Sequence, residues 1–145
     1  MLYIIATIRL NYMRNSIKTL FISSFLLMFM FGCFPKTLIV DSLPCESLDN
    51  PKEIIKRTYM LQTNEVPMAI EVTDEYIKWN FKVSKPKIVY FKYISDLRLV
   101  DDNSGRVEIR FKNNATNDTQ IILTLDQEIA IRGYSAIKCM IESNK

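Results

Sequence analysis

The sequence contains no histidine among its 145 residues. Ser/His and Cys/His nucleophile pairs, HExxH zinc sites and histidine-based acid-base catalysis all require an imidazole that titrates near neutral pH, so these classes are excluded. A Ser-Lys or paired-carboxylate enzyme is not excluded, but no residue pattern favours one. The adjacent carboxylates Asp101 and Asp102 are more simply explained as turn residues. We therefore expect no enzyme activity, no catalytic residue, no metal and no cofactor.

Acidic residues are absent from the first 32 positions, which contain Arg9, Arg14 and Lys18. These three cations account for the whole formal charge of +3, so residues 33–145 carry 16 basic and 16 acidic side chains. A nucleic-acid-binding protein needs a surplus of cations to displace counterions from phosphates. The balanced charge argues against a nucleic-acid partner.

The sequence also lacks an apolar run long enough to cross a bilayer. Residues 20–31 form 12 uncharged positions, and extending the run to 19–34 gives only 16. A transmembrane helix needs about 18 or more apolar residues, whereas this length is typical of the apolar core of a signal peptide. The basic segment that begins at Met13 precedes the run as in secretory signals, which makes Met13 a candidate for the true start.

The end of this segment resembles a bacterial lipoprotein signal. Met30, Phe31, Gly32 and Cys33 occupy the positions at which that family places a short motif ending in a small residue and an invariant cysteine. The resemblance implies removal of residues 1–32, acylation of Cys33 and anchoring of the mature protein to a membrane of the bacterial cell envelope. Two or three acyl chains make a stable anchor without any transmembrane helix. The alternatives are an uncleaved signal anchor and secretion after cleavage elsewhere, and all three place residues 36–145 outside the cytoplasm.

The two remaining cysteines, Cys45 and Cys139, form an even pair, as expected for a disulfide in an oxidising compartment. A bridge between them would close a loop that spans most of the mature chain. The alternative is a free Cys139 buried on a helix and a free Cys45 exposed in a loop.

Prolines and the lack of a sustained period predict that residues 33–50 form a lipidated tether and that residues 51–145 form a single globular domain. The domain begins with a predicted helix over 51–61. Asn50 can cap this helix, Pro51 suits its first position and Glu53 can complete a capping box.

Alternating apolar and polar residues then predict about six antiparallel strands in a meander or a partly open barrel. Ile77, Trp79, Phe81 and Val83 share one face of a strand, and residues 107–112 repeat this pattern. Short turn-rich clusters separate the strands, and no connection is long enough for a parallel crossover. A closing amphipathic helix begins after Asp126, and Gly133 within it indicates a close approach of helix to sheet. The predicted fold class is α+β.

This order of elements resembles the pleckstrin-homology superfold, particularly its small bacterial versions. The residues that carry the resemblance are EVTDEYIKW (71–79), IVYFKYISDLRLV (88–100) and the helix from Asp126. The family has seven strands and lacks the helix at 51–61. The alternative fold is a six-stranded sheet with a helix packed on one face.

Three hypotheses for function follow. The first is a lipid-anchored module that binds or scaffolds a partner protein of the envelope. The second is recognition of lipid headgroups or other anions by a lysine-rich hairpin, for which a solvated lysine face is the simpler explanation. The third is an envelope enzyme, which the sequence does not favour. The candidate headgroup-binding residues are Lys78, Lys82, Lys85, Lys87 and Lys92.

Tyr90, Phe91 and Tyr93 bear on these hypotheses because they crowd into one predicted strand. At least one of the three rings must leave the core face, and an exposed aromatic cluster would indicate a partner site. The alternative is that the helix at 51–61 covers these rings.

Overall fold

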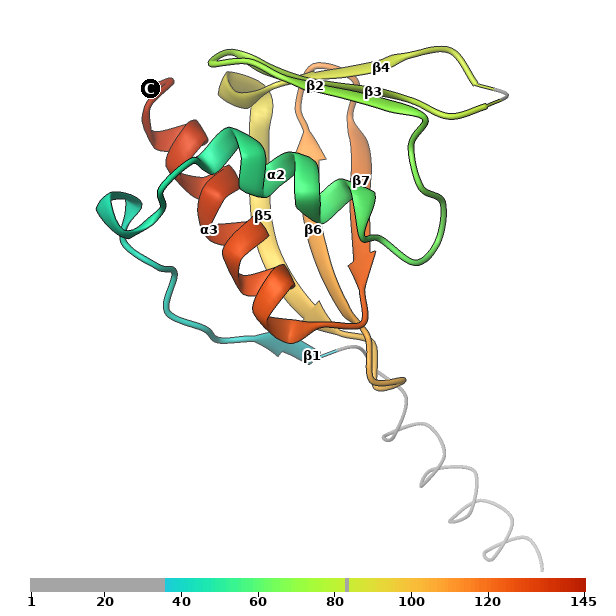
Figure 1. The fold of residues 1–145 in the computed structure, drawn as a ribbon. Coiled ribbons are helices and arrows are strands. Elements are labelled where there is room, and N and C mark those ends of the chain that lie inside the picture. Colours follow the sequence, from blue (N-terminus) through green and yellow to red (C-terminus); the bar gives the residue numbers. More distant parts are fainter. Residues whose placement is uncertain (1–35, 83) are drawn as a thin grey trace, which may run out of the picture. The chain divides into compact units, whose positions relative to one another are not determined.

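The computed structural model describes residues 36–82 and 84–145, which form two antiparallel sheets and two helices (Figure 1). The four-stranded sheet has the strand order β1-β5-β6-β7, and the three-stranded sheet has the order β2-β3-β4. The elements in chain order are β1 (Lys36–Leu38), the 3-10 turn η1 (Cys45–Ser47), α2 (Pro51–Met60), β2 (Ala69–Val72), β3 (Tyr76–Asn80), β4 (Lys87–Tyr90), the 3-10 turn η2 (Phe91–Tyr93), β5 (Ile94–Asp101), β6 (Val107–Asn113), β7 (Asp118–Thr124) and α3 (Gln127–Glu142).

The four-stranded sheet buries one face along its central strands. Every second residue of β6 is buried, which is the alternation expected of a strand with one face on the core. Leu99 of β5, Ile109 of β6 and Ile122 of β7 lie directly opposite one another in the register and are all buried. The strand β1 extends the sheet by pairing with the last three residues of β5.

The three-stranded sheet buries Ile77 and Trp79 of β3 on its inner face. Phe91 follows β4 and is fully buried, and η2 turns the chain between β4 and β5. Consequently β4 and β5 belong to different sheets. The ring of Trp79 lies 5.1 Å from the ring of Tyr59 in α2, measured between centroids.

Both helices begin at the predicted caps. The side chain of Asn50 accepts a hydrogen bond from the Glu53 amide at the start of α2, and Asp126 accepts from the amides of Glu128 and Ile129 at the start of α3. These bonds satisfy amides that have no partner within the helix. Figure 1 shows both helices on the same side of the four-stranded sheet.

Gly133 of α3 lies against α2 as well as against the sheet. A Cβ at this position would lie 2.6 Å from Thr58 Oγ1 and 3.1 Å from Ile109 Cδ1. The close approach predicted from this glycine is therefore present, but the shortest distance is to the helix α2 rather than to the sheet.

The structure confirms the predicted α+β class, the antiparallel pairing, the helix before the strands and the closing helix. It adds a seventh strand, β1, and divides the strands between two sheets without closing a barrel. The segment 88–94, predicted as one strand, contains the last residues of β4, then η2 and the first residue of β5. The resemblance to the pleckstrin-homology superfold stays a prediction.

Residues 36–50 are more closely joined to the domain than the predicted tether implies. They contain β1, η1, the buried side chain of Leu48 and a cysteine bridged to α3. Three residues of strand are too few to show a period in the sequence, which is why β1 was missed.

Within residues 36–82 and 84–145, no helix combines the length and the apolar character that crossing a membrane would need. The predicted signal peptide over 1–32, the candidate start Met13 and the predicted lipidation residue Cys33 lie outside the described residues.

Candidate functional site

Three tyrosines gather on the outer face of the three-stranded sheet. Tyr76 of β3 lies directly opposite Tyr90 of β4, and both side chains point away from the face that buries Ile77 and Val89. Tyr93, at the end of η2, adds a third ring. We call Tyr76, Tyr90, Tyr93 and the adjacent Lys92 the tyrosine surface.

The rings of the tyrosine surface contact one another edge to face. The centroids of Tyr76 and Tyr90 are 5.7 Å apart at an interplanar angle of 66°, and those of Tyr90 and Tyr93 are 6.2 Å apart at 80°. Lys92 Nζ lies 5.1 Å from the Tyr93 centroid and 5.9 Å from that of Tyr90. Such ring pairs and cation-ring contacts favour a fixed arrangement, so the surface is ordered before any partner binds.

Tyr76 is also held by a carboxylate. Its hydroxyl donates a hydrogen bond of 2.9 Å to Glu71 Oε1, and this bond raises the pKa of the Tyr76 hydroxyl above its ordinary value, with smaller contributions from desolvation and nearby charges. Lys78 Nζ lies 3.5 Å from the other oxygen of Glu71. Glu71 therefore contacts both Tyr76 of the tyrosine surface and Lys78 on the central strand β3.

The sequence predicts that at least one of the rings of Tyr90, Phe91 and Tyr93 leaves the core, and in the structure two of them do. Phe91 is fully buried, whereas Tyr90 and Tyr93 are each 39% exposed. The helix α2 does not cover them, because its Tyr59 packs on Trp79, which lies on the opposite face of the sheet. An aromatic cluster at the surface of a small domain is typical of a contact site for a partner.

The five predicted lysines do not form one cluster. Lys92 joins the tyrosines and Lys78 pairs with Glu71, while Lys87 lies opposite Trp79 at the other end of the β3-β4 pair. Lys82 and Lys85 are exposed in the β3-β4 connection. Within the described part of the chain, Lys82, Lys85, Lys87 and Lys92 have no ion-pair partner.

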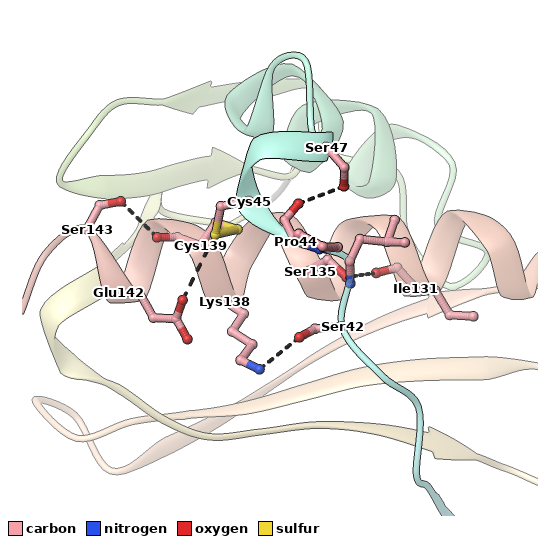
Figure 2. Close-up of a disulfide and its surroundings, with 11 residues drawn as sticks. Ser42, Pro44, Cys45, Ser47, Ile131, Ser135, Lys138, Cys139, Glu142 and Ser143 are labelled. Atoms are coloured by element: carbon pink, nitrogen blue, oxygen red, sulfur yellow. Dashed lines mark hydrogen bonds between the residues drawn. A yellow bond between two sulfur atoms is a disulfide. The ribbon is translucent and has the colours of Figure 1, made fainter.

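The structure brings together the two cysteines that the sequence analysis paired. The sulfur atoms of Cys45 and Cys139 are 2.05 Å apart, and the bridge joins η1 to the last turns of α3 (Figure 2). Two hydrogen bonds hold the same segment on α3: the Leu43 amide donates to Ser135 Oγ, and Lys138 Nζ donates to Ser42 Oγ. The Glu142 carboxylate lies 4.0 Å from Cys45 Sγ, a contact without a hydrogen bond because a bridged sulfur carries no proton.

The carboxylates of Asp101 and Asp102 serve the β5-β6 turn. Asp101 accepts a hydrogen bond from the Asn103 amide, and Asp102 accepts from Ser104 and Arg106. Together these bonds, led by the Ser104 hydroxyl, hold the pKa of Asp102 well below its usual range. Among the residues that the structure describes, no group of three or more Cys, Asp or Glu side chains is placed to hold a metal ion.

Sequence reasoning identified Tyr90 and Tyr93 but missed Tyr76. Tyr76 joins the other two rings only through the β3-β4 register, and this register depends on pairing between strands that a single sequence does not show. Comparison of the chain with models of protein families, with curated proteins and with solved structures finds no match. The function is therefore argued from the residues themselves.

Proposed function

We propose that this chain is a lipid-anchored protein of the bacterial envelope whose domain binds a partner protein through the tyrosine surface. The observation that carries the proposal is the cluster of contacting rings that half-buried Tyr76 forms with exposed Tyr90 and Tyr93 on the outer face of the three-stranded sheet. Aromatic side chains present a large contact area at a low cost in conformational entropy, and they are enriched in protein interfaces.

The proposed acylation residue is close in sequence to one end of the domain. Cys33 precedes Lys36 by three residues, which span at most about 11 Å in any conformation. Lys36 pairs with Asp101, the last residue of β5. An anchor on Cys33 therefore places the end of the four-stranded sheet near the membrane.

The tyrosine surface lies at the opposite end of β5. Tyr93 comes immediately before Ile94, where this strand begins, so the strand separates Tyr93 from Asp101 by roughly 25 Å at about 3.3 Å per residue. Figure 1 shows β1 at one end of the domain and the three-stranded sheet at the other. The proposed partner site therefore faces away from the anchoring membrane, where another envelope protein can reach it.

The bridge between Cys45 and Cys139 supports a location outside the cytoplasm, because structural disulfides persist in oxidising compartments. This observation is independent of the lipoprotein motif. It is consistent equally with acylation at Cys33, with an uncleaved signal anchor and with secretion.

Metabolic labelling with a fatty acid tests the anchor. The wild-type chain should take up the label, and Cys33→Ser should lose it, whereas Cys45→Ser serves as the matched control because Cys45 belongs to the bridge. Equal labelling of wild type and Cys33→Ser would remove the lipoprotein assignment.

Photo-crosslinking in the native host tests the partner site. A photoreactive phenylalanine at Tyr90 should form a specific crosslinked product that Tyr76→Ser and Tyr93→Ser weaken. The same probe at Leu125, which is 67% exposed at the anchor-proximal end of the sheet, is the control. Two results would reject the tyrosine surface as the site: identical products from both positions, or a product yield that the two serine substitutions do not change.

A second candidate function is recognition of anionic headgroups. It is favoured by Lys82, Lys85 and Lys87, which have no ion-pair partner among the described residues. The distance between Lys36 and the three-stranded sheet argues against contact with the anchoring membrane itself. Flotation of the unacylated Cys33→Ser protein with anionic liposomes tests this function. Loss of flotation on changing the three lysines to alanine would support it, and flotation that the three substitutions leave unchanged would reject it.

A further inference from the structure

The strand β7 forms an open edge of the four-stranded sheet. It pairs with β6 on one side, and no described strand pairs with its other side. At the far edge of the same sheet, β1 pairs with Leu99–Asp101 of β5.

The backbone groups that β7 presents at its open edge follow from one hydrogen bond. The Thr63 amide donates to the Leu123 carbonyl at 2.8 Å, so the backbone of Leu123 points away from β6. In an antiparallel pair this orientation recurs at every second residue. The amides and carbonyls of Thr119 and Ile121 therefore also point outward from the sheet.

The loop around Thr63 covers only the end of this edge at Leu123. Ile121 is 43% exposed, and none of the described residues bonds to the outward backbone groups of Thr119 and Ile121. Unpaired strand edges readily accept a further strand. Among the described residues, the outward backbone of β7 is thus hydrogen-bonded at Leu123 but not at Ile121 and Thr119.

A groove of about 280 Å³ runs beside these open positions. Its walls come from the loop that follows α2, from the loop end of the β3-β4 hairpin and from β7 itself. Trp79 and Phe81 add apolar side chains to an otherwise largely polar lining, which includes Lys87. The lining residues are Tyr59, Gln62, Asn64, Glu65, Trp79, Phe81, Lys87, Thr119, Gln120 and Ile121.

One lining residue carries an unsatisfied donor. The Tyr59 hydroxyl is buried and has no hydrogen-bond partner among the described residues. Burial raises the pKa of this hydroxyl, so it stays protonated and retains its donor. A buried polar group without a partner is costly and therefore rare in native proteins. A peptide carbonyl that reached this hydroxyl would remove that cost.

We propose that this groove binds an extended peptide segment of a partner protein, which adds to β7 as a further strand. The peptide backbone would bond to Thr119 and Ile121 in the way that Thr63 bonds to Leu123. A peptide residue opposite Gln120 would share the inner face of the sheet, where Trp79 and Phe81 favour an apolar side chain. Its neighbours would point outward and be polar.

The walls of the groove select a peptide over a second copy of this chain. Pairing of β7 with β7 of another copy needs a long edge that a whole domain can approach. Here the loop at Thr63 covers one end of the edge, and the loop end of the β3-β4 hairpin also lines the groove. Two open residues suit a short segment of about three to five residues. This site is separate from the tyrosine surface and does not depend on it.

The test uses the full-length chain in detergent micelles and a displayed library of random nine-residue peptides. Selected peptides should alternate apolar and polar residues. Amide exchange measured by NMR should show that the Thr119 and Ile121 amides exchange fast in the free protein and become protected by the peptide. Protection of these two amides is the direct signature of strand addition.

Two variants with a matched control sharpen the test. Ile121→Pro removes an outward amide without removing a bond to β6, because proline is accepted on an edge whose amide faces outward. It should weaken peptide binding about tenfold, whereas Ile121→Val keeps the amide and should not. Tyr59→Phe should weaken binding about two- to tenfold without lowering the Tm of the free protein.

Three outcomes would overturn the proposal. The first is selected peptides that leave the Thr119 and Ile121 amides fast to exchange. The second is peptide affinity that both Ile121→Pro and Tyr59→Phe leave unchanged. The third is concentration-dependent protection of the two amides without peptide, with a dimer mass, which would assign the edge to a second copy of the chain.

Discussion

Replacing Gly133 with alanine tests how tightly α3 packs on α2. A Cβ at this position would lie 2.6 Å from Thr58 Oγ1 and 2.7 Å from Thr58 Cγ2. Thr58 cannot turn away easily, because it is β-branched, 1% exposed and donates a hydrogen bond of 2.8 Å to the Ile54 carbonyl. The two helices must therefore separate or shift to admit one methyl group.

The expected loss of stability follows from two opposing terms. Overpacking of a well-packed core costs about 1 to 3 kcal/mol. Alanine favours a helix interior over glycine by about 1 kcal/mol. Because Thr58 is held by its own hydrogen bond, we expect the steric term to dominate and Gly133→Ala to lower the free energy of unfolding by about 1 to 2 kcal/mol.

The assay is equilibrium urea denaturation of four proteins: wild type, Gly133→Ala, Thr58→Ala and the double variant. Removing the Thr58 side chain beyond Cβ opens the space that the new methyl group needs. In the Thr58→Ala background, Gly133→Ala should therefore be neutral or stabilising by up to about 1 kcal/mol. The reasoning is refuted if Gly133→Ala stabilises the wild-type protein, or if the cost is the same in both backgrounds.

Three further predictions concern the bridge, a helix cap and a turn. The bridge between Cys45 and Cys139 closes a separation of 94 residues, so replacing both with alanine should lower the free energy of unfolding by about 4 to 5 kcal/mol in urea titrations, and a loss below about 1 kcal/mol would contradict the chain-entropy account. Asp126→Ala removes the acceptor for two amides at the start of α3 and should cost about 1 kcal/mol, whereas Asp126→Asn should retain most of the capping, as thermal melts can show. The hydrogen bonds to Asp102 lower its pKa, so its contribution to stability holds above the pKa of the unfolded carboxyl, about 3.9, and is lost as the pH falls through the folded value. The stability difference between wild type and Asp102→Asn should thus shrink below about pH 4, and a difference that does not depend on pH would contradict this role.

Local patterns predicted the elements whose signals lie within a few residues. The alternation along β6, the cap at Asp126 and the Asn50-Pro51 start of α2 are all visible in the sequence and present in the structure. Their bonds and faces depend on neighbours in the chain, so a single sequence is enough to locate them.

The division into two sheets could not be predicted in the same way. The segment from Ile88 to Ile94 is apolar or aromatic except for Lys92, and such a run fits one long strand as well as two strands with a turn between them. The burial of Phe91 decides between them, and it depends on contacts far along the chain. Tyr76 of the tyrosine surface and the open edge of β7 were missed for the same reason, since both are defined by strand pairing.

The bridge at Cys45 also determines how the domain responds to a pull at its amino-terminal end. Force applied at Lys36 would first peel the three residues of β1 away from β5, and then straighten the chain as far as Cys45. The released segment then spans up to about 30 Å in total, at about 3.3 Å for each of nine residues. Beyond Cys45 the bridge passes load directly into α3, in parallel with the chain that leads into α2. A domain held at Lys36 would thus extend by this segment before its core is loaded.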